Sequence, residues 1–331
     1  MRHAETIIIG GGPAGSSCAW KLRQRGHDVL ILDKAEFPRL KLCAGWITTK
    51  VMQDLQFSQD DYPHPILKLQ IHSHIKGLPF SLRGLPTPGD NYSIRRVEFD
   101  HWLLHRSDAE TIQHTVKTIR RDGDLYIVDD QFSCRNLVGA GGTSCPIRRN
   151  FFPDNRRKFR QVVTLEHEFE YPDRADICHL YFRHYGAKAY AWYFPKADGF
   201  VNIGLGGKAN AYKMSEKNIH QHFKSFLFDL VEQGLLDRQT AENFHSTGHP
   251  YYLYSDHGEV KKDRIYLIGD AAGLATVDLG EGIGPAIESA LMAADEILGS
   301  PGYMKNAVTQ FSTAGLAQRL ARRFIAPKAV Q

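Results

Sequence analysis

The order of hydrophobic and polar residues predicts alternating strands and helices at both ends of the chain. Near the N-terminus the apolar run 7–9 predicts a strand, residues 14–24 a helix and the apolar run 27–32 a second strand. Towards the C-terminus an apolar strand in RIYLIGDAAG is followed by an amphipathic helix in GIGPAIESALMAADEIL. Strands that alternate with helices in this way indicate an α/β domain.

The middle of the chain has a different pattern. Aromatic and polar residues alternate over 160–207, which predicts several strands, and a helical pattern follows near 215–232. Shorter strands are expected over 66–95, a helix over 96–107, and further strands up to about residue 138.

From the order of these elements we predict two intergrown domains. One is an α/β domain of two or three layers, and the other is a largely antiparallel sheet that is inserted into it and binds the substrate. The first is expected to comprise residues 1–65, 96–158 and 256–331, and the second residues 66–95 and 159–255.

A glycine-rich turn joins the first predicted strand to the first helix. Its glycines fit the pattern G-x-G-x-x-G, and an aspartate closes the next strand. Glycines let backbone amides approach a pyrophosphate, while the aspartate is placed to accept hydrogen bonds from ribose hydroxyls. The unit predicts a bound dinucleotide but cannot distinguish FAD from NAD(P), because both contain ADP. The candidate residues are Gly10, Gly12, Ala14, Gly15, Asp33 and Lys34.

Composition narrows the kind of protein further. The 331 residues are 42% hydrophobic and 24% charged, which is ordinary for a globular protein. A net charge of +4 and the lack of a nucleic-acid-reading motif argue against nucleic acid as a partner. The five cysteines form no C-x-x-C pair, the 16 histidines are scattered, and no apolar run approaches the roughly 18 residues of a membrane span. We therefore expect a cytoplasmic protein without a metal site.

The α/β segment towards the C-terminus contains motifs whose resemblance to a known family favours FAD over NAD(P). Its G-D pair at 269–270 and its G-E-G-I run at 280–283 resemble motifs of an FAD-dependent family. That family contains geranylgeranyl reductases and FixC-type dehydrogenases and, more distantly, flavin halogenases and monooxygenases of the hydroxybenzoate-hydroxylase type. The resemblance implies non-covalent FAD in a Rossmann-like domain of the glutathione-reductase-2 type. It places Asp270 at the ribityl chain, and Gly280, Gly282 and Ile283 at the pyrophosphate and the pyrimidine edge of the flavin.

The stretch SIRRVEFDHWLL resembles the R-x-x-F-D-x-x-L segment of the same family. The resemblance places Arg96 near the FAD phosphates, and a guanidinium suits that role because its fork pairs with phosphate oxygens.

The stretch EFPRLKLCAGWIT resembles the FPR-x-K-x-C-G-G pattern of the reductase branch. It places Cys43, Ala44 and Gly45 in the loop that passes the flavin, with Arg39 and Lys41 on the approach. A single cysteine is most often a small buried side chain. The resemblance makes Cys43 a candidate for shaping the pocket or for giving a proton.

The stretch AYAWYFPKADG resembles the family's Y-x-W-x-F-P motif. On a strand, Tyr190, Trp192 and Phe194 would share one face. Such an aromatic stripe suits either a core or a binding wall, and the resemblance favours the wall. Cys43, Tyr190 and Trp192 are therefore the candidate catalytic residues.

The resemblance implies an FAD-dependent oxidoreductase that reduces carbon–carbon double bonds of a small apolar, isoprenoid-like substrate. A flavin monooxygenase or halogenase, and an electron-transfer flavoprotein without bond chemistry, stay open as alternatives. Gly141 stands where many relatives have an aspartate that organises nicotinamide, which favours a protein electron donor over NAD(P)H. NAD(P)H and a reduced ferredoxin-type protein both stay open as the donor. The basic amphipathic stretch AQRLARRFIAPKAV adds the expectation of a peripheral membrane contact.

Overall fold

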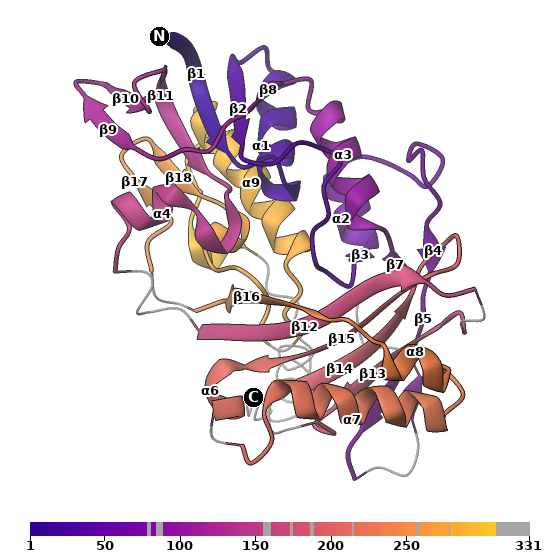
Figure 1. The fold of residues 1–331 in the computed structure, drawn as a ribbon. Coiled ribbons are helices and arrows are strands. Elements are labelled where there is room, and N and C mark those ends of the chain that lie inside the picture. The colour runs from indigo at the N-terminus through magenta and orange to yellow at the C-terminus, as the bar shows by residue number, and fades with distance from the viewer. Residues whose placement is uncertain are drawn as a thin grey trace, which may run out of the picture.

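Three β-sheets organise the chain in the computed structural model drawn in Figure 1. The structure describes residues 1–77, 81–83, 89–154, 160–172, 175–185, 189–213, 215–255, 258–277 and 279–308. The basic C-terminal stretch lies outside these ranges. None of the helices within them combines the length and the apolar character that a membrane span requires.

The first sheet has a parallel centre. Its central strands are mostly buried, which is why they read as nearly continuous apolar runs, whereas its last strand is mostly exposed. The parallel order is β18 (Ile265–Leu267), β11 (Phe132–Gly139), β1 (Arg2–Ile9), β2 (Val29–Asp33) and β8 (Glu110–Gln113). Antiparallel strands extend it, namely β17 (Lys261–Lys262) on β18 and the hairpin of β9 (Ile119–Asp122) and β10 (Leu125–Val128) on β11.

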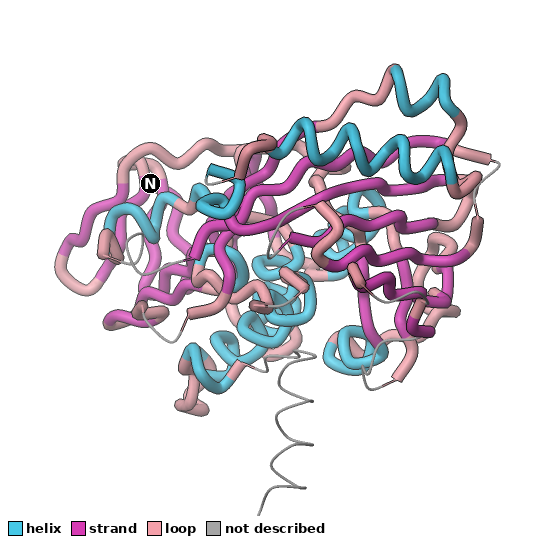
Figure 2. The backbone as a smooth tube through the Cα atoms, turned by 90° about the horizontal axis from the view of Figure 1, so that it is seen from below, coloured by secondary structure: helices cyan, strands magenta, loops and turns pink. Residues whose placement is uncertain are grey.

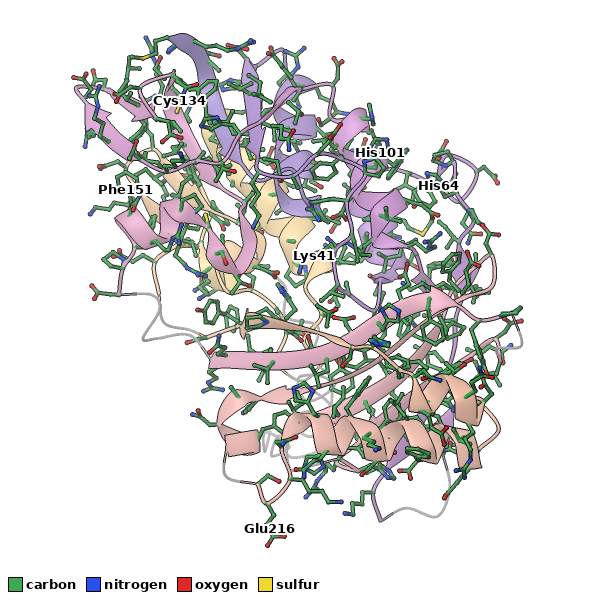
Figure 3. All side chains as sticks on the ribbon, in the orientation of Figure 1. Lys41, His64, His101, Cys134, Phe151 and Glu216 are labelled. Atoms are coloured by element: carbon green, nitrogen blue, oxygen red, sulfur yellow. The ribbon has the colours of Figure 1, made fainter. Side chains whose placement is uncertain are left out.

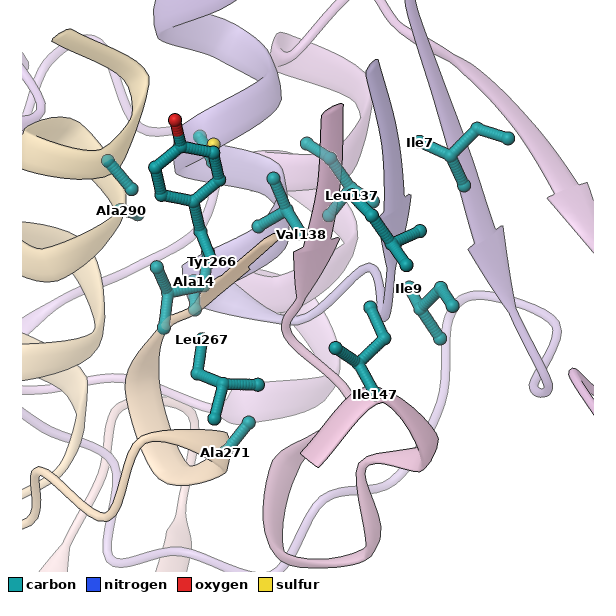
Figure 4. Close-up of a cluster of buried hydrophobic side chains, with 14 of the residues drawn as sticks. Ile7, Ile9, Ala14, Leu137, Val138, Ile147, Tyr266, Leu267, Ala271 and Ala290 are labelled. Carbon is teal, nitrogen blue, oxygen red and sulfur yellow. The ribbon is translucent and has the colours of Figure 1, made fainter. Parts of the chain in front are cut away.

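Three longer helices pack around this sheet. The helices α1 (Pro13–Arg23) and α9 (Ile283–Ile297) pack against each other, and α3 (Arg96–Arg106) packs against α1. Figure 4 shows Ile7, Val138 and Leu267 of the central strands in one buried cluster with Ala290 of α9. Short helices complete the domain: η1 (Gly142–Ser144), α4 (Pro146–Phe151), η2 (Gly269–Ala271) and η3 (Lys305–Ala307).

The second sheet is antiparallel except where β13 meets β5. Its order is β16 (Thr247–Leu253), β12 (Arg160–Glu170), β15 (Phe200–Lys208), β14 (Ala189–Pro195), β13 (Ile177–Phe182), β5 (Gln70–Ile75) and β6 (Leu82–Arg83). The helices α7 (Ile219–Glu232) and α8 (Arg238–Glu242) cover one face, and α6 (Ala209–Lys213) follows β15. Figure 2 shows helices lying across these strands. The opposite face turns towards the first sheet, and the predicted fold class is confirmed.

A third, small sheet lies between the two larger ones. It consists of β3 (Trp46–Thr48), β7 (Asn91–Ser93) and β4 (Leu67–Lys68), followed after β3 by α2 (Thr49–Asp54). The sequence assigned all of 66–95 to the substrate sheet, but among the described residues of that stretch only β5 and β6 pair there. The boundaries of the two domains stay a prediction.

Candidate active site

The glycines of the turn after β1 have two different roles: two are needed for the turn to fold, and one leaves open space beside it. Gly10 has φ +113°, and a Cβ there would overlap the Ala140 carbonyl oxygen; a Cβ on Gly15 would overlap the Gly10 carbonyl oxygen. A Cβ on Gly12 would meet only Arg39 Nη2, at 3.1 Å. Gly10 and Gly15 therefore let the turn fold, whereas Gly12 leaves a cradle at the N-terminus of α1.

Asp33 holds this turn closed. Its Oδ2 accepts from the Gly11 amide at 2.7 Å and its Oδ1 from the Ala35 amide at 2.8 Å, and the residue is buried. Each carboxylate oxygen can still accept a second hydrogen bond, so the predicted ribose contact stays compatible with the structure. The neighbouring Lys34 is exposed.

Two arginines meet one buried carboxylate beside the turn. Arg96 binds Asp100 in a fork, with Nε to Oδ1 at 2.6 Å and Nη2 to Oδ2 at 2.7 Å, while Arg39 Nη1 lies 3.3 Å from Asp100 Oδ2. Burial lowers the pKa of Arg96, but Asp100 and Cys43 outweigh it and raise the pKa above its usual value. Of the two guanidiniums, that of Arg39 stands at Gly12. Arg39 is thus a phosphate-binding candidate that the site assignment missed, and the role predicted for Arg96 stays a prediction.

The second predicted nucleotide segment forms a corner next to α1. A Cβ on Gly269 would lie 3.0 Å from Cβ of Ala14 and 3.2 Å from Cβ of Ala286, which brings the starts of α1 and α9 together. Gly282 caps α9, and its position faces Asp270, whose Oδ1 would lie 3.3 Å from an added Cβ. Within the described ranges the Asp270 carboxylate makes no hydrogen bond or ion pair with another residue. An unpaired carboxylate between two helix N-termini is suited to bind hydroxyls near phosphates.

The remaining residues of this segment contribute backbone. Gly280 has φ +63° and is packed under Tyr251, whose hydroxyl an added Cβ would overlap. The side chain of Ile283 is buried in a cluster with Ile47 and Phe99, so only its main chain faces the corner.

The loop 43–45 is fixed by a buried lysine that sequence reasoning missed. Lys196 Nζ donates to the Ala44 carbonyl at 2.7 Å and to the Ile94 carbonyl at 2.6 Å, and lies 3.1 Å from Glu168 Oε2. Gly45 has φ +72°, and a Cβ there would overlap both the Ile94 carbonyl and the lysine. Cys43 is partly exposed, and its Sγ accepts from the Gly45 amide at 3.3 Å.

The aromatic residues of β14 lie where the strand period predicts. Tyr190, Trp192 and Phe194 share the face turned to the small sheet and the loop before α9, while Tyr193 packs on the opposite face with the residues of α7. The Tyr190 hydroxyl donates to the Leu279 carbonyl, and Trp192 is 4% exposed. The pair forms a wall on the sheet face nearest the Asp270 corner.

Lys41 bridges the two parts of the molecule. Its Nζ lies 2.8 Å from His249 Nε2 on β16, and Figure 3 shows Lys41 between the helices of the first domain and the second sheet. Burial lowers the pKa of Lys41, and Arg96 lowers it further against the opposite effect of Asp270. Burial, with Lys41, also lowers the pKa of His249 to about 4. The neutral His249 therefore accepts a hydrogen bond from the Lys41 ammonium group at Nε2.

Glu166 is a buried acid on the same sheet face. Burial raises its pKa to about 7, although Asn202, Lys41, Lys196 and Arg96 all favour the charged form. Because the folded state then binds the proton more tightly than the unfolded chain, the free energy of unfolding should fall as pH rises from about 4.5 to 7.

We expect Glu166→Gln to remove this contribution. Buried histidines such as His249 act with the opposite sign over pH 4 to 6.5, because they are uncharged when folded. The difference between wild type and variant isolates Glu166: chemical denaturation at a series of pH values should show that the advantage of the glutamine variant grows towards neutrality. An unchanged difference across the series would show that Glu166 titrates normally.

The geometry fits a flavin dinucleotide. The cradle at Gly12, Arg39 and the start of α1 suits a pyrophosphate, and Asp270 with the start of α9 suits the ribityl chain and the anionic edge of a reduced flavin. Among the described residues, no group of three or more His, Cys, Asp and Glu side chains could hold a metal ion. The fold and the site together define an FAD-binding oxidoreductase.

Comparisons with known proteins identify the kind of oxidoreductase. Residues 8–66 match the family model of an NAD(P)-binding Rossmann-like domain, and residues 160–240 match that of the geranylgeranyl reductase catalytic domain. Digeranylgeranylglycerophospholipid reductase 3 of Methanosphaera stadtmanae is 26% identical over 88% of this chain and 77% of its own length. Menaquinone reductase of Mycolicibacterium smegmatis is 27% identical over 97% of this chain and 82% of its own.

Solved structures agree on the fold. A geranylgeranyl bacteriochlorophyll reductase-like protein of Thermoplasma acidophilum superposes with a TM-score of 0.73 at 16% identity, over 98% of this chain and 84% of its own. A flavin-dependent brominase superposes with a TM-score of 0.65 at 19% identity, over 96% and 83%. The expected resemblance to geranylgeranyl reductases is confirmed, and the chain is an FAD-dependent oxidoreductase.

Proposed function

We propose that the protein reduces carbon–carbon double bonds of an isoprenoid-like lipid. The observation that carries the proposal is the aromatic wall of Tyr190 and Trp192, which stands on the sheet face nearest the Asp270 corner. An apolar chain lying against this wall would be held away from water. The names of the relatives, reductases of a geranylgeranyl lipid and of menaquinone, support an apolar substrate.

The residues of the chain bind, orient and supply a proton. When bound and reduced, FAD supplies a hydride for one carbon of the double bond. The other carbon needs a proton, and two groups hold one close to the corner: Lys41 at Nζ and Cys43 at Sγ. Lys41 is the better candidate of the two, because its hydrogen bond to His249 fixes the position of its ammonium group.

The electron donor is proposed separately, as a reduced protein of the ferredoxin type. Gly141, at the start of η1, offers no carboxylate to organise a nicotinamide. Reduction of the flavin by reduced ferredoxin, followed by absorbance, should be much faster than reduction by NADH or NADPH. Equal or faster reduction by a nicotinamide would assign that role to NAD(P)H.

The function is tested with chemically reduced enzyme under anaerobic conditions. A prenyl-chain lipid should reoxidise the flavin and yield a product heavier by two hydrogens, as mass spectrometry would show. Trp192→Ala should slow reoxidation about tenfold or more without loss of FAD, because it removes the wall and no cofactor contact. Cys43→Ser should slow the reaction if the thiol gives the proton, and leave it nearly unchanged if the side chain only packs.

Two results would overturn the assignment. Reoxidation that requires oxygen, with an oxygenated or halogenated product, would transfer the protein to the monooxygenase and halogenase class. Failure of every organic acceptor to reoxidise the flavin would indicate an electron-transfer flavoprotein.

A further inference from the structure

A chain of three hydrogen-bonded polar groups starts at the aromatic wall and runs along the same face of the sheet. The Trp192 indole Nε1 donates to Asn202 Oδ1 at 2.6 Å, and Asn202 Nδ2 donates to Glu166 Oε2 at 3.2 Å. All three residues are nearly completely buried, with 4%, 1% and 3% exposure. The three come from neighbouring strands, β14, β15 and β12, so the chain crosses the sheet on the face that carries the wall.

The strand β15 has glycine at the two positions opposite the aromatic residues of the wall. Gly204 lies opposite Trp192 and Gly206 opposite Tyr190 in the register of β14 and β15. A Cβ on Gly204 would overlap the indole ring and come within 2.9 Å of Cβ of Glu166, and one on Gly206 would lie 3.5 Å from Cζ3 of Trp192. The indole therefore lies flat on a glycine floor, with only its Nε1 edge tied to the sheet.

Glu166 determines which way the Asn202 amide faces. Oε2 of Glu166 acts as the acceptor, as either a carboxylate oxygen or the carbonyl oxygen of the protonated acid, so it selects the Nδ2 end and leaves Oδ1 for the indole. Without an acceptor at 166 the buried amide would lose one partner, and nothing would keep Oδ1 aimed at Trp192.

Three cations and one uncharged hydroxyl interact electrostatically with Glu166. They are Lys41, Lys196, Arg96 and the Tyr251 hydroxyl. None of the three cations makes an ion pair with it among the described residues, so the amide of Asn202 is the direct partner.

We infer that Glu166 and Asn202 are positioning residues that hold the Trp192 indole against its glycine floor and so set the width of the substrate slot. Neither need touch the substrate or the flavin. The inference rests on the proposed function for what fills the slot, but the placement of the indole is independent of it.

The test uses the FAD-loaded full chain and reads the Trp192 indole directly. Its Nε1–H resonance is assigned as the one that disappears in Trp192→Phe. Glu166→Leu and Asn202→Ala should shift this resonance and speed its exchange with solvent about tenfold, as expected for loss of one buried hydrogen bond. Glu166→Gln should keep the resonance near its wild-type position, because the glutamine carbonyl can accept from Asn202.

Thr164→Val is the matched control. It lies two residues from Glu166 on the same face of β12 and removes a hydrogen bond to the His249 carbonyl without reaching Asn202. It should leave the indole resonance unchanged. If Glu166→Leu and Asn202→Ala move the resonance no more than Thr164→Val does, the positioning role is wrong.

Turnover separates this inference from the proposed function. In the leucine variant KM for a bulky prenyl lipid should rise several-fold more than kcat falls, with FAD content unchanged. If the indole resonance shifts in the variants but the wild type turns over no prenyl lipid, the proposed function is wrong and the positioning role is retained. A moved indole with kinetics identical to wild type on a working substrate would show that the slot is elsewhere.

Discussion

Replacing Gly12 with valine should yield a folded protein that has lost its FAD. Gly12 has φ −73° and ψ −175°, a conformation open to any residue, and the nearest atom to an added Cβ is the flexible end of Arg39. The protein itself therefore has room for the side chain. We predict that backbone amides at the start of α1 approach the pyrophosphate through the same space. Loss of two charge-assisted hydrogen bonds weakens binding by about 100-fold or more.

Flavin absorbance after purification and titration of the apoprotein with FAD would measure this effect. Thermal unfolding of the apoprotein should resemble that of wild-type apoprotein. Gly248→Ala is the control, because its Cβ would sit at ordinary van der Waals distance, 3.5 Å, from Leu165 and far from the turn. FAD bound normally by the valine variant would place the pyrophosphate somewhere other than this cradle.

Gly15→Ala completes the comparison. Its Cβ would overlap the Gly10 carbonyl oxygen, so the turn itself could not close. We expect this variant to unfold more easily with or without FAD, unlike the valine variant at residue 12.

Local patterns were enough to predict the dinucleotide unit. The helix expected over 14–24 is α1 (Pro13–Arg23), and the strand expected over 27–32 is β2 (Val29–Asp33). Both elements are encoded by neighbours within one short segment, where apolar period and glycine spacing act directly.

Pairings between distant segments could not be predicted in the same way. The strands β4 and β7 lie in the stretch expected to join the substrate sheet, yet they pair with β3. Each is only two or three residues long, so its own side chains specify no partner, and the choice is made by what the rest of the chain places beside it.

The site shows the same division. The aromatic face of β14 follows from the two-residue period, and a related signal was present in NIGLGG, where Asn202, Gly204 and Gly206 fall on one face. The partner of Asn202 lies 36 residues away in sequence, and the sequence marks no link between them. Likewise the sequence marked Arg96 as a phosphate-binding candidate, but only the structure shows that Asp100 occupies the fork of Arg96 and that Arg39 lies at Gly12.

Lys196 is the clearest case of a role that no local pattern reveals. A lysine next to proline reads as a solvated turn residue, since lysine is almost never fully buried unless it is paired. Here its ammonium is fully buried, and its partners come from positions 44, 94 and 168. The lysine thus ties the loop that carries Cys43 to β12 of the second sheet.

We therefore expect Lys196→Met to lower the free energy of unfolding by about 3–5 kcal/mol. The methionine fills similar volume but leaves the Ala44 and Ile94 carbonyls without their donor, while Glu168 keeps Arg95, whose Nε lies 3.1 Å from Oε1. Denaturant unfolding would measure the loss of unfolding free energy. FAD binding should also be weaker, because the loop 43–45 is no longer held in place. Lys68→Met removes an exposed ion pair with Asp90 and should leave both quantities unchanged within error. If the two lysine variants unfolded at the same denaturant concentration, the buried lysine would not be what anchors the loop 43–45.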